Sequence, residues 1–436
     1  MSQHLRKPFE VAIIGGGIAG ITLAISLLKR SVPCVIYEKA HRFGEVGAGL
    51  GISPNAIRAM KSCDPSIHDA FDKVSNGNIW ESKKDVMFDF LDGMDDSTDL
   101  EPRFTIKSGV GLQGSHRGHF LNALLDVLPN NVACFNQCLD HTEEPQTNHS
   151  EKLRMFFRDG TVAEADTIIG YDGVKSRTRE LLVGQDDPSA KCSYTHKYAY
   201  RGMIPMEQVV QLMGEERALN SSLWMGENMH LTTYPVAHGT ICNLVAYRSS
   251  TKNWPSETQL TLPAREEIFL EDFKGFRPLL QKLIKMVRDL DQWAMFDLGD
   301  HPVPAFAKRR VCITGDAAHA TTPHQGAGAG FCIEDAAVLA SLLADEKVKT
   351  TSDIQAAFAA FDSSRRERSQ WLVQSCRRAG DLYDLQTEVG NHFETMAEEL
   401  RQSMAIIWNY SIEDAIRDAV DDLGKRLATE SENKRN

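Results

Sequence analysis

Residues 11–38 read VAIIGGGIAGITLAISLLKRSVPCVIYE, and the order of apolar runs and glycines in them is the clearest indication of the fold. The apolar run Val11–Ile14 is typical of a buried strand, and residues 35–37 form a second apolar run of the same kind. Between them lie a glycine turn and an apolar stretch of helical character that extends to Lys29. A strand, a turn, a helix and a strand in this order predict a βαβ unit with parallel strands.

The glycine turn has the spacing Gly15-x-Gly17-x-x-Gly20, and Glu38 ends the second strand. Gly15 permits a tight turn, Gly17 lets the backbone approach a pyrophosphate, and Gly20 lets the helix pack closely on the strand. Amides at the start of the helix can bind anionic oxygens, and Glu38 can hydrogen-bond ribose hydroxyls. A glycine turn without a ligand is the competing interpretation. Strand, helix and acid in register favour a Rossmann-type site for a dinucleotide, without telling which one.

The composition excludes several classes of protein. The chain has 436 residues, of which 42% are hydrophobic and 25% charged, as in ordinary globular proteins and unlike disordered or collagen-like chains. The 60 acidic and 48 basic residues give a formal net charge of -12, which argues against a general nucleic-acid binder. The nine cysteines are scattered without CxxC pairs, so we expect reduced thiols and no metal site. We find neither a signal peptide nor roughly 18 consecutive apolar residues, and expect a cytoplasmic protein without a membrane span.

The hydrophobic pattern changes along the chain. Strand-like alternation runs from about residue 193 to 248 and includes a hairpin of residues 229–236 and 240–248. Residues 310–314 form another short apolar strand, so we expect the chain to return to the first domain there, and residues 353–429 have helical periodicity. The predicted division is 1–80, 111–185 and 301–350 for the dinucleotide-binding domain, 81–110 and 186–300 for the substrate domain, and 351–436 for a C-terminal helical region.

Two further motifs carry a family resemblance. Residues 170–179 read GYDGVKSRTR after an apolar run, and residues 315–319 read GDAAH and continue through TTPHQGAGAG to Glu334 and Asp335. Together with the first glycine motif, they resemble the single-component (group A) FAD-dependent aromatic hydroxylases, of the p-hydroxybenzoate and salicylate hydroxylase type, over residues 10 to about 380. The resemblance implies an α/β fold: a Rossmann-type FAD-binding domain, an inserted and mostly antiparallel β-sheet substrate domain, and C-terminal helices.

The resemblance also implies a resident FAD and roles for single residues. Asp316 is expected on the FAD ribose, Asp172 on both FAD and NAD(P)H, and Arg117 against the flavin. Independently, glycines between residues 326 and 330 let backbone amides approach a flavin, and the following helix N-terminus can stabilise negative charge on it. A helix cap is the competing role for Asp316. The expected FAD-binding residues are Gly15, Gly17, Gly20, Glu38, Arg117, Asp172, Asp316, Gly326, Gly328 and Ala329.

Only one GxGxxG unit is present, so we expect no second Rossmann domain for NADPH or NADH. In this respect the sequence resembles enzymes in which the nicotinamide binds transiently and leaves after reducing the flavin. His319 and His324 fit a structural or pocket-lining role better than that of an acid or base. His230 and Trp224 are expected near the pocket on weak grounds, and Met225 and Met229 in the core.

On the substrate side, the resemblance implies a flavin C4a-hydroperoxide that oxidises an electron-rich ring, such as a phenolate. Arg201 can favour the phenolate by a charge-assisted hydrogen bond, and Tyr234 can position the same oxygen. Pro323 matches the family's proline beside the flavin, where proximity of the reactants supplies much of the rate. The competing roles are a surface ion pair for Arg201, a core position for Tyr234 and a turn for Pro323.

With a tyrosine at position 234, the sequence resembles the fungal dearomatising hydroxylases of polyketide secondary metabolism. The substrates of those enzymes are resorcinol-type aldehydes or ketones. The expected partners are therefore a small phenolic substrate and molecular oxygen. Two alternatives remain open: a salicylate-type decarboxylating hydroxylase that yields a catechol, and a flavin-fold binding protein without turnover. The sequence leaves open whether the protein is a monomer or a homodimer.

Overall fold

Residues 11–38 form the centre of a six-stranded sheet in the computed structural model, which describes residues 6–44, 49–97, 100–145, 152–256, 259–288 and 290–433. Strand β1 (Val11–Ile14) is buried along its whole length and pairs in parallel with β2 (Cys34–Glu38). Helix α1 (Ile18–Lys29) connects the two strands. The predicted βαβ unit is confirmed.

Strands from distant parts of the chain complete this first sheet. β12 (Thr167–Gly170) pairs in parallel with both β1 and β20 (Val311–Ile313), so the expected return of the chain near residue 311 is confirmed. The strand order is β19-β20-β12-β1-β2-β8, with β8 (Ala133–Phe135) and β19 (Ala307–Lys308) at the edges.

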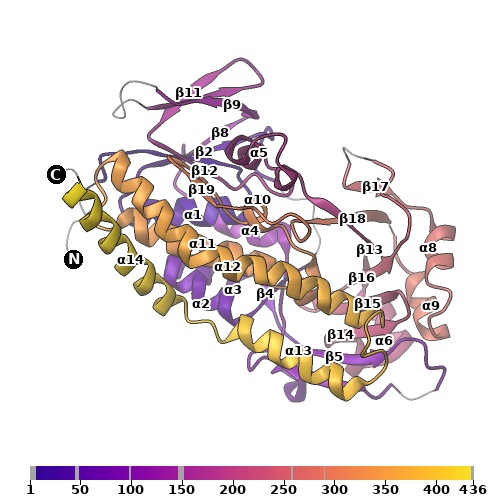
Figure 1. Cartoon of the computed structure of the whole chain (residues 1–436). Helices are drawn as coiled ribbons and strands as arrows, with labels where there is room; N and C mark the ends of the chain where they lie inside the picture. Colours follow the sequence, from indigo (N-terminus) through magenta and orange to yellow (C-terminus); the bar gives the residue numbers. More distant parts are fainter. Residues whose placement is uncertain are drawn as a thin grey trace.

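Helices cover the first sheet and continue to the second. Helix α11 (Gly328–Ala344) packs against α1 and α2 (Pro54–Cys63), and the side chains between them form the largest apolar core. The long helix α12 (Thr351–Tyr383) lies beside α14 (Ile412–Asn433), and α13 (Phe393–Trp408) contacts strand β6 of the second sheet (Figure 1). The C-terminal helices therefore join both sheets. The shorter helices on this side are α3 (Pro65–Asp72) and α4 (Arg117–Leu125).

The second sheet has eight strands in the order β17-β18-β13-β16-β15-β14-β5-β6. All neighbours are antiparallel except β14 and β5, so the prediction of a mostly antiparallel sheet is confirmed. The strands of this sheet come from two parts of the chain, one before residue 111 and one after residue 185. The strands are β5 (Val86–Asp92), β6 (Phe104–Lys107), β13 (Ser193–Pro205), β14 (Ser222–Gly226), β15 (Met229–Val236), β16 (Ile241–Ser249), β17 (Thr261–Pro263) and β18 (Asp291–Asp297).

The two faces of the second sheet have different neighbours. One face packs in an apolar core with short helices, among them α6 (Met206–Met213), α8 (Glu266–Asp272) and α9 (Pro278–Ile284), and residues from α7 (Glu215–Ala218) join this core. The other face turns toward the first sheet and α12. Because side chains alternate between faces along a strand, each strand of this sheet contributes every second residue to either side.

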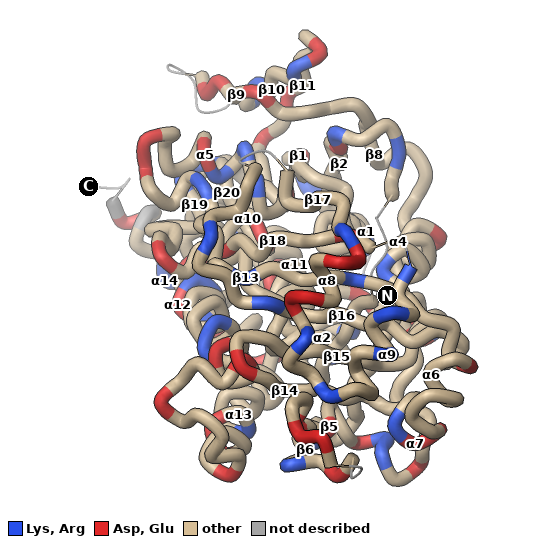
Figure 2. The backbone as a smooth tube through the Cα atoms, turned by 90° about the vertical axis from the view of Figure 1, so that its right-hand side faces the viewer, with Lys and Arg blue, Asp and Glu red and all other residues tan. Residues whose placement is uncertain are grey.

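Two small sheets and five short elements complete the architecture, and two of the short elements are the 3-10 turns η1 (Glu81–Lys83) and η2 (Pro188–Ala190). One small sheet packs against the second large sheet, since β15 contacts its strands β4 (Ser75–Asn76) and β7 (Gln113–His116). Figure 2 shows the other small sheet near the top of the molecule, with acidic and basic positions intermixed along the chain. None of the helices in the described ranges combines the length and the apolar character needed to span a bilayer. The division into domains at residues 80, 110, 185, 300 and 350 stays our proposal. The remaining elements are β3 (Gly49–Ile52), β4 (Ser75–Asn76), β7 (Gln113–His116), β9 (Leu139–Glu143), β10 (Leu153–Phe157), β11 (Val162–Ala165), α5 (Arg177–Val183), α10 (Asp316–His319) and the 3-10 turn η3 (Pro323–Gln325).

Candidate active site

A continuous cavity of about 740 Å³ runs between the two large sheets. Gly15, Gly17 and Glu38 line one end, and Arg201 and Tyr234 line the other. Its size is in the range of cofactor and substrate sites. The cavity brings together most of the predicted site residues, including Arg117, Asp172, Asp316, Pro323, Gly326, Gly328 and Ala329.

The glycine turn at the first end has no room for side chains. Gly15 has φ +109°, and a Cβ atom there would lie 2.4 Å from the carbonyl oxygen of Tyr171. A Cβ atom on Gly20 would lie 2.1 Å from the carbonyl oxygen of Gly15. Helix α1 has Gly17 at its N-cap, without a side-chain cap or an acidic residue in its first turn. Its first amides are therefore available to an anionic ligand in the cavity.

Glu38 is held by the backbone beside this turn. One carboxylate oxygen accepts a hydrogen bond from the Gly16 amide at 2.6 Å, and the other accepts one from the Ala40 amide at 2.8 Å. Each carboxylate oxygen can accept more than one hydrogen bond. Glu38 is thus oriented toward the end of the cavity and keeps acceptor capacity for a hydroxyl group.

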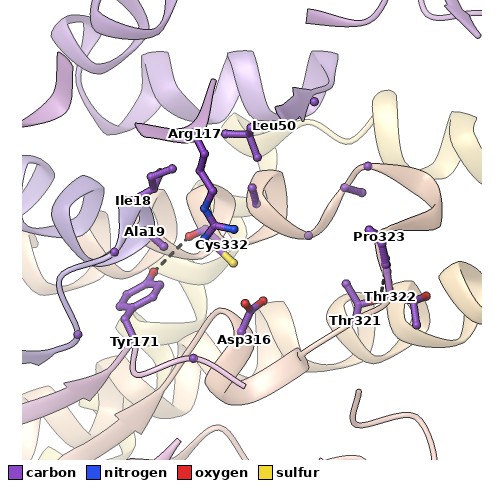
Figure 3. A pocket seen from close by; sticks show the side chains of 18 of the residues that line it. Ile18, Ala19, Leu50, Arg117, Tyr171, Asp316, Thr321, Thr322, Pro323 and Cys332 are labelled. Atoms are coloured by element: carbon purple, nitrogen blue, oxygen red, sulfur yellow. Dashed lines mark hydrogen bonds between the residues drawn. The ribbon is translucent and has the colours of Figure 1, made fainter. Parts of the chain in front are cut away.

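The third motif lies in the middle of the cavity. Gly326 adopts the left-handed conformation with φ +61°, and helix α11 begins two residues later with neither a side-chain cap nor an acid in its first turn. Asp316 is the first residue of α10, whose N-cap is Gly315, so its carboxylate is not used as the cap. Figure 3 shows Arg117 and Asp316 extending into the same space from opposite sides.

A buried ionic cluster holds the third motif in place. Asp335 accepts hydrogen bonds from the Thr314 hydroxyl at 2.8 Å and the Gly315 amide at 3.2 Å. It also contacts His319 at 2.6 Å and Arg365 at 2.8 Å. Although burial opposes the charge, His319 and Arg365 hold the pKa of Asp335 well below its usual range. His319 therefore has the structural role that the sequence favours.

Asp172 has a local structural contact in addition to its place in the cavity. Its carboxylate accepts hydrogen bonds from the Ser176 hydroxyl at 2.5 Å and the Thr178 amide at 2.9 Å. These bonds stabilise the start of α5. Its predicted contact with FAD and NAD(P)H stays a prediction.

The donors and acceptors along this cavity fit FAD. Two helix N-termini without side-chain caps can bind the pyrophosphate and a negatively charged flavin. Glu38 and Asp316 offer acceptors to hydroxyl groups in the same cavity, and Arg117 adds a positive charge to its lining. The residues therefore match a long ligand with a nucleotide at one end and a ring system at the other.

The second sheet supplies the substrate end of the cavity. The strand register aligns Arg201 with Val245, Val245 with Thr232, and Thr232 with Leu223, and all four side chains line the cavity. These residues lie far apart in the sequence, and they share a face because each has the same phase in its strand.

Arg201 is fixed in orientation at this end. Its guanidinium carbon lies 4.2 Å from the centre of the Trp293 ring, which is a cation-π contact. Its Nε has no hydrogen-bond partner within the part of the chain that the structure describes. Burial lowers the pKa of Arg201, yet an arginine stays charged in a protein. Arg201 therefore offers a half-buried positive charge to the cavity, and its buried Nε is a donor without a partner among the described residues.

Tyr234 is 8% exposed and lies against strand β3. A Cβ atom on Gly49 would lie only 2.5 Å from its hydroxyl oxygen, so a glycine at that position leaves room for the hydroxyl. Burial raises the pKa of Tyr234, and the hydroxyl remains protonated at neutral pH and can donate. Pro323 is the first residue of η3, follows Thr322 and also lines the cavity (Figure 3).

The prediction for Trp224 is wrong, and that for His230 is correct. His230 lines the cavity, whereas Trp224 is opposite Leu231 on the other face of the sheet and is buried in the core there. The reason is the phase of β14, which places Leu223 on the cavity side and Trp224 on the far side. Met225 and Met229 are core residues, as predicted.

Several lining residues were not predicted from the sequence. Tyr247 stacks on His230 with ring centres 4.2 Å apart, and its position two residues from Val245 on one strand was the only available signal. The ring of Tyr383 at the end of α12 has no such signal, because helix α12 meets the sheet only in the folded chain. The unpredicted lining residues include Met87, Leu112, Thr232, Tyr247 and Tyr383.

Comparisons with known proteins show what the whole chain is similar to. A family model described as FAD binding domain matches residues 136–375, and one described as NAD(P)-binding Rossmann-like domain matches residues 13–50. The FAD-dependent monooxygenase pigN of Monascus ruber is 40% identical over 96% of this chain and 97% of its own length. The 6-methylsalicylate 1-monooxygenase atA of Aspergillus terreus is 36% identical over 94% of this chain and 91% of its own length. A solved salicylate hydroxylase substrate complex is 29% identical, with a TM-score of 0.83 over 95% of this chain and 98% of that one.

Proposed function

Since this chain belongs to the FAD-dependent aromatic monooxygenases of the salicylate hydroxylase type, we propose that it uses NADPH or NADH and molecular oxygen to hydroxylate a resorcinol-type phenol with loss of aromaticity. The observation that carries the proposal is that Arg201 and Tyr234 of the second sheet line the same cavity as Pro323. The proposed substrate is a polyketide-derived aldehyde or ketone of fungal secondary metabolism.

FAD, when bound, supplies the activated oxygen that is transferred to the ring. The remaining work falls to the side chains of the chain itself. Glu38, Arg117, Asp172 and Asp316 are proposed to hold the cofactor, together with the glycines of the first and third motifs. Pro323 and the residues around it are proposed to hold the ring within reach of the reacting oxygen, since proximity supplies much of the rate.

Arg201 is proposed to bind the phenol oxygen of the substrate and to favour its ionised form. A buried guanidinium lowers the pKa of a bound phenol, because its charge stabilises the phenolate in a site that excludes water. The Trp293 ring holds the guanidinium in one orientation. The protonated Tyr234 hydroxyl donates a second hydrogen bond to the same oxygen. Both contacts favour the ionised phenol, whose ring is richer in electrons than that of the neutral phenol, and an electrophilic oxygen requires such a ring.

A salicylate-type hydroxylase is the second candidate. It is favoured by the similarity to the salicylate hydroxylase structure and to the 6-methylsalicylate 1-monooxygenase. Such an enzyme would bind a carboxylate next to the phenol, release carbon dioxide and yield a catechol. Arg201 could then pair with the carboxylate in place of the phenolate.

The experiment incubates purified enzyme with FAD, NADPH and either an alkylated 2,4-dihydroxybenzaldehyde or salicylate, and identifies the products by mass and ultraviolet spectrum. The proposal expects a product that gains one oxygen atom and loses its aromatic absorption. Catechol from salicylate would instead support the second candidate. NADPH oxidation without either phenol is the control, and oxidation that neither phenol stimulates would contradict both candidates.

A further inference from the structure

A group of buried polar side chains lies at the substrate end of the cavity and has no part in the function proposed above. Its central member is His230, which is 1% exposed and lines the cavity from β15. Its Nδ1 lies 2.6 Å from a carboxylate oxygen of Asp384. Because Nδ1 is turned toward Asp384, Nε2 on the opposite side of the ring is the nitrogen left for the cavity.

Asp384 directly follows helix α12 and is fully buried. Its second carboxylate oxygen accepts hydrogen bonds from the Ser249 hydroxyl at 2.7 Å and from the ammonium group of Lys197. Lys197 also donates to Gln386 at 2.9 Å and lies 3.1 Å from Asp381. Although burial opposes the charge, His230 and Lys197 hold the pKa of Asp384 well below its usual range. Asp384 is therefore an ionised carboxylate.

The ionised Asp384 determines which nitrogen of His230 carries hydrogen. A carboxylate without a proton can only accept hydrogen bonds, so Nδ1 of His230 must be the donor. Burial lowers the pKa of His230, and the ring is neutral at neutral pH. A neutral imidazole with hydrogen on Nδ1 has a lone pair on Nε2. The side of His230 that faces the cavity is thus a hydrogen-bond acceptor.

Neighbouring rings fix this acceptor in place. Tyr247 stacks on His230 with ring centres 4.2 Å apart and planes 11° apart. His324 also lines the cavity, with its ring centre 5.2 Å from that of His230 and its Nδ1 2.9 Å from the Thr322 hydroxyl. Burial, with His230 next to it, lowers the pKa of His324 well below its usual value. Both imidazoles at this end are therefore neutral.

The distance along the strand leaves room for one aromatic ring between His230 and Tyr234. They are four residues apart on β15, on the same face, which corresponds to about 13 Å between their Cα atoms at about 3.3 Å per residue. A ring whose first hydroxyl is bound by Arg201 and Tyr234 can present a second hydroxyl toward Nε2 of His230.

We propose that His230, oriented by Asp384 and Lys197, accepts a hydrogen bond from a second hydroxyl group of the substrate. This inference rests on the proposed function, because it assumes that Arg201 and Tyr234 hold the first hydroxyl. A hydroxyl has the hydrogen that the Nε2 lone pair requires, whereas a carboxylate has none and adds a negative charge near Asp384. His230 and Asp384 therefore select substrates with two ring hydroxyls over substrates with one hydroxyl and a carboxylate. His230 is the residue that contacts substrate, and Asp384 is a positioning residue.

The first test compares substrates on the FAD-loaded enzyme without turnover. The probes are an alkylated 2,4-dihydroxybenzaldehyde and its two mono-O-methyl ethers, titrated against the flavin absorbance. The wild-type enzyme is expected to bind the dihydroxy compound roughly tenfold or more tightly than either ether, because each ether leaves one buried partner unpaired. In His230→Phe, loss of the preference over one of the ethers is expected, while the preference over the other remains.

The second test uses Asp384→Asn, which keeps the size of the side chain. It is designed to turn Nε2 of His230 from a hydrogen-bond acceptor into a donor. Lys197 has donors only, so the carbonyl oxygen of the new amide must face Lys197 and its NH₂ group must face His230. Nδ1 then accepts, and Nε2 carries the hydrogen and becomes a donor. The expected result is a loss of the dihydroxy preference together with tighter binding of salicylate relative to wild type. A merely structural role of Asp384 would weaken all ligands alike.

The outcomes separate this inference from the proposed function. Oxygenation of the dihydroxy compound with an unchanged hydroxyl preference in both variants would overturn the inference and leave the proposed function standing. Equal affinity of the wild-type enzyme for the dihydroxy compound and both ethers would also overturn the inference and leave the proposed function standing. If none of the phenols perturbs the flavin or is oxygenated, the proposed function is wrong, and the inference falls with it. Flavin content and circular dichroism of both variants establish that they are folded.

Discussion

The two ends of the cavity are built in different ways. From the nucleotide end to the middle of the cavity, the groups that face the ligand are backbone amides and glycines from short continuous stretches, such as residues 15–20 and 326–329, with few side chains such as Glu38 among them. At the substrate end, the groups are side chains such as Arg201, His230 and Tyr247, each from a different strand of the second sheet. Ligand contacts made by backbone amides change little when a single side chain is replaced. Ligand contacts made by side chains change with each replacement.

This difference separates cofactor binding from substrate choice. The cofactor-binding part of the cavity is held at the third motif by the buried cluster around Asp335, which lies outside the cavity and fixes the loop after β20. The substrate end lies on a sheet whose register is set by the strands behind it. Changes at one end should therefore leave the other end intact, and four substitutions test this separation.

The largest effect is expected from Asp316→Ala, which removes the only proposed side-chain contact of the third motif with the FAD ribose. Loss of a charge-assisted hydrogen bond should weaken FAD binding about 10- to 100-fold. The ratio of flavin absorbance to protein absorbance after purification measures this loss, and FAD titration gives the affinity. A variant that purifies fully yellow would show that Asp316 does not hold the cofactor.

Arg201→Lys should produce the next largest effect, at the other end of the cavity. One compact ammonium replaces a planar fork that rests on Trp293, so oxygenation of the phenol should fall about 10- to 100-fold while FAD remains bound. Product formation per NADPH consumed, with flavin content as the control, distinguishes the two ends. Unchanged product formation would remove Arg201 from the substrate site.

Tyr234→Phe should have a smaller effect of the same kind. The substitution removes one neutral hydrogen bond and keeps the ring, so the affinity for the phenol should fall about five- to tenfold. Because burial raises the pKa of Tyr234, the lost group is a protonated donor and the effect should be the same from pH 6 to pH 9. Flavin-absorbance titration at these pH values is the measurement. An effect that appears only at high pH would mean that the tyrosine acts as an anion.

The same contrast explains how far the sequence predicts the site. Gly15, Gly17, Gly20 and Glu38 belong to one βαβ unit whose local geometry follows from the strand, turn and helix pattern, and the structure places them together. Arg201 was expected from a family resemblance, since alternation alone does not tell which face of a strand meets the cofactor.

The substrate end also holds residues with no sequence signal at all. Asp384 stands after a 33-residue helix and reaches His230 only because α12 packs beside the second sheet. Trp224 was expected at the pocket and lies behind it, because the phase of a five-residue strand is set by its pairing with β15 and β5, and pairing partners are distant in the sequence. Such information becomes available only when tertiary contacts are known.

Trp224→Phe, the smallest of the four effects, tests this assignment of faces. Trp224 is fully buried, and its indole nitrogen has no hydrogen-bond partner within the described ranges of the chain. The smaller ring leaves a gap in the core, which destabilises, but it also removes an unpaired N-H group, which stabilises. The net loss should be about 1 kcal/mol of unfolding free energy, measurable in a denaturant titration, with substrate affinity unchanged within about twofold. Leu223→Ala is the matched change on the cavity face of the same strand, and it should alter substrate affinity instead. If the two variants affect substrate affinity alike, the assignment of the two faces of β14 is wrong.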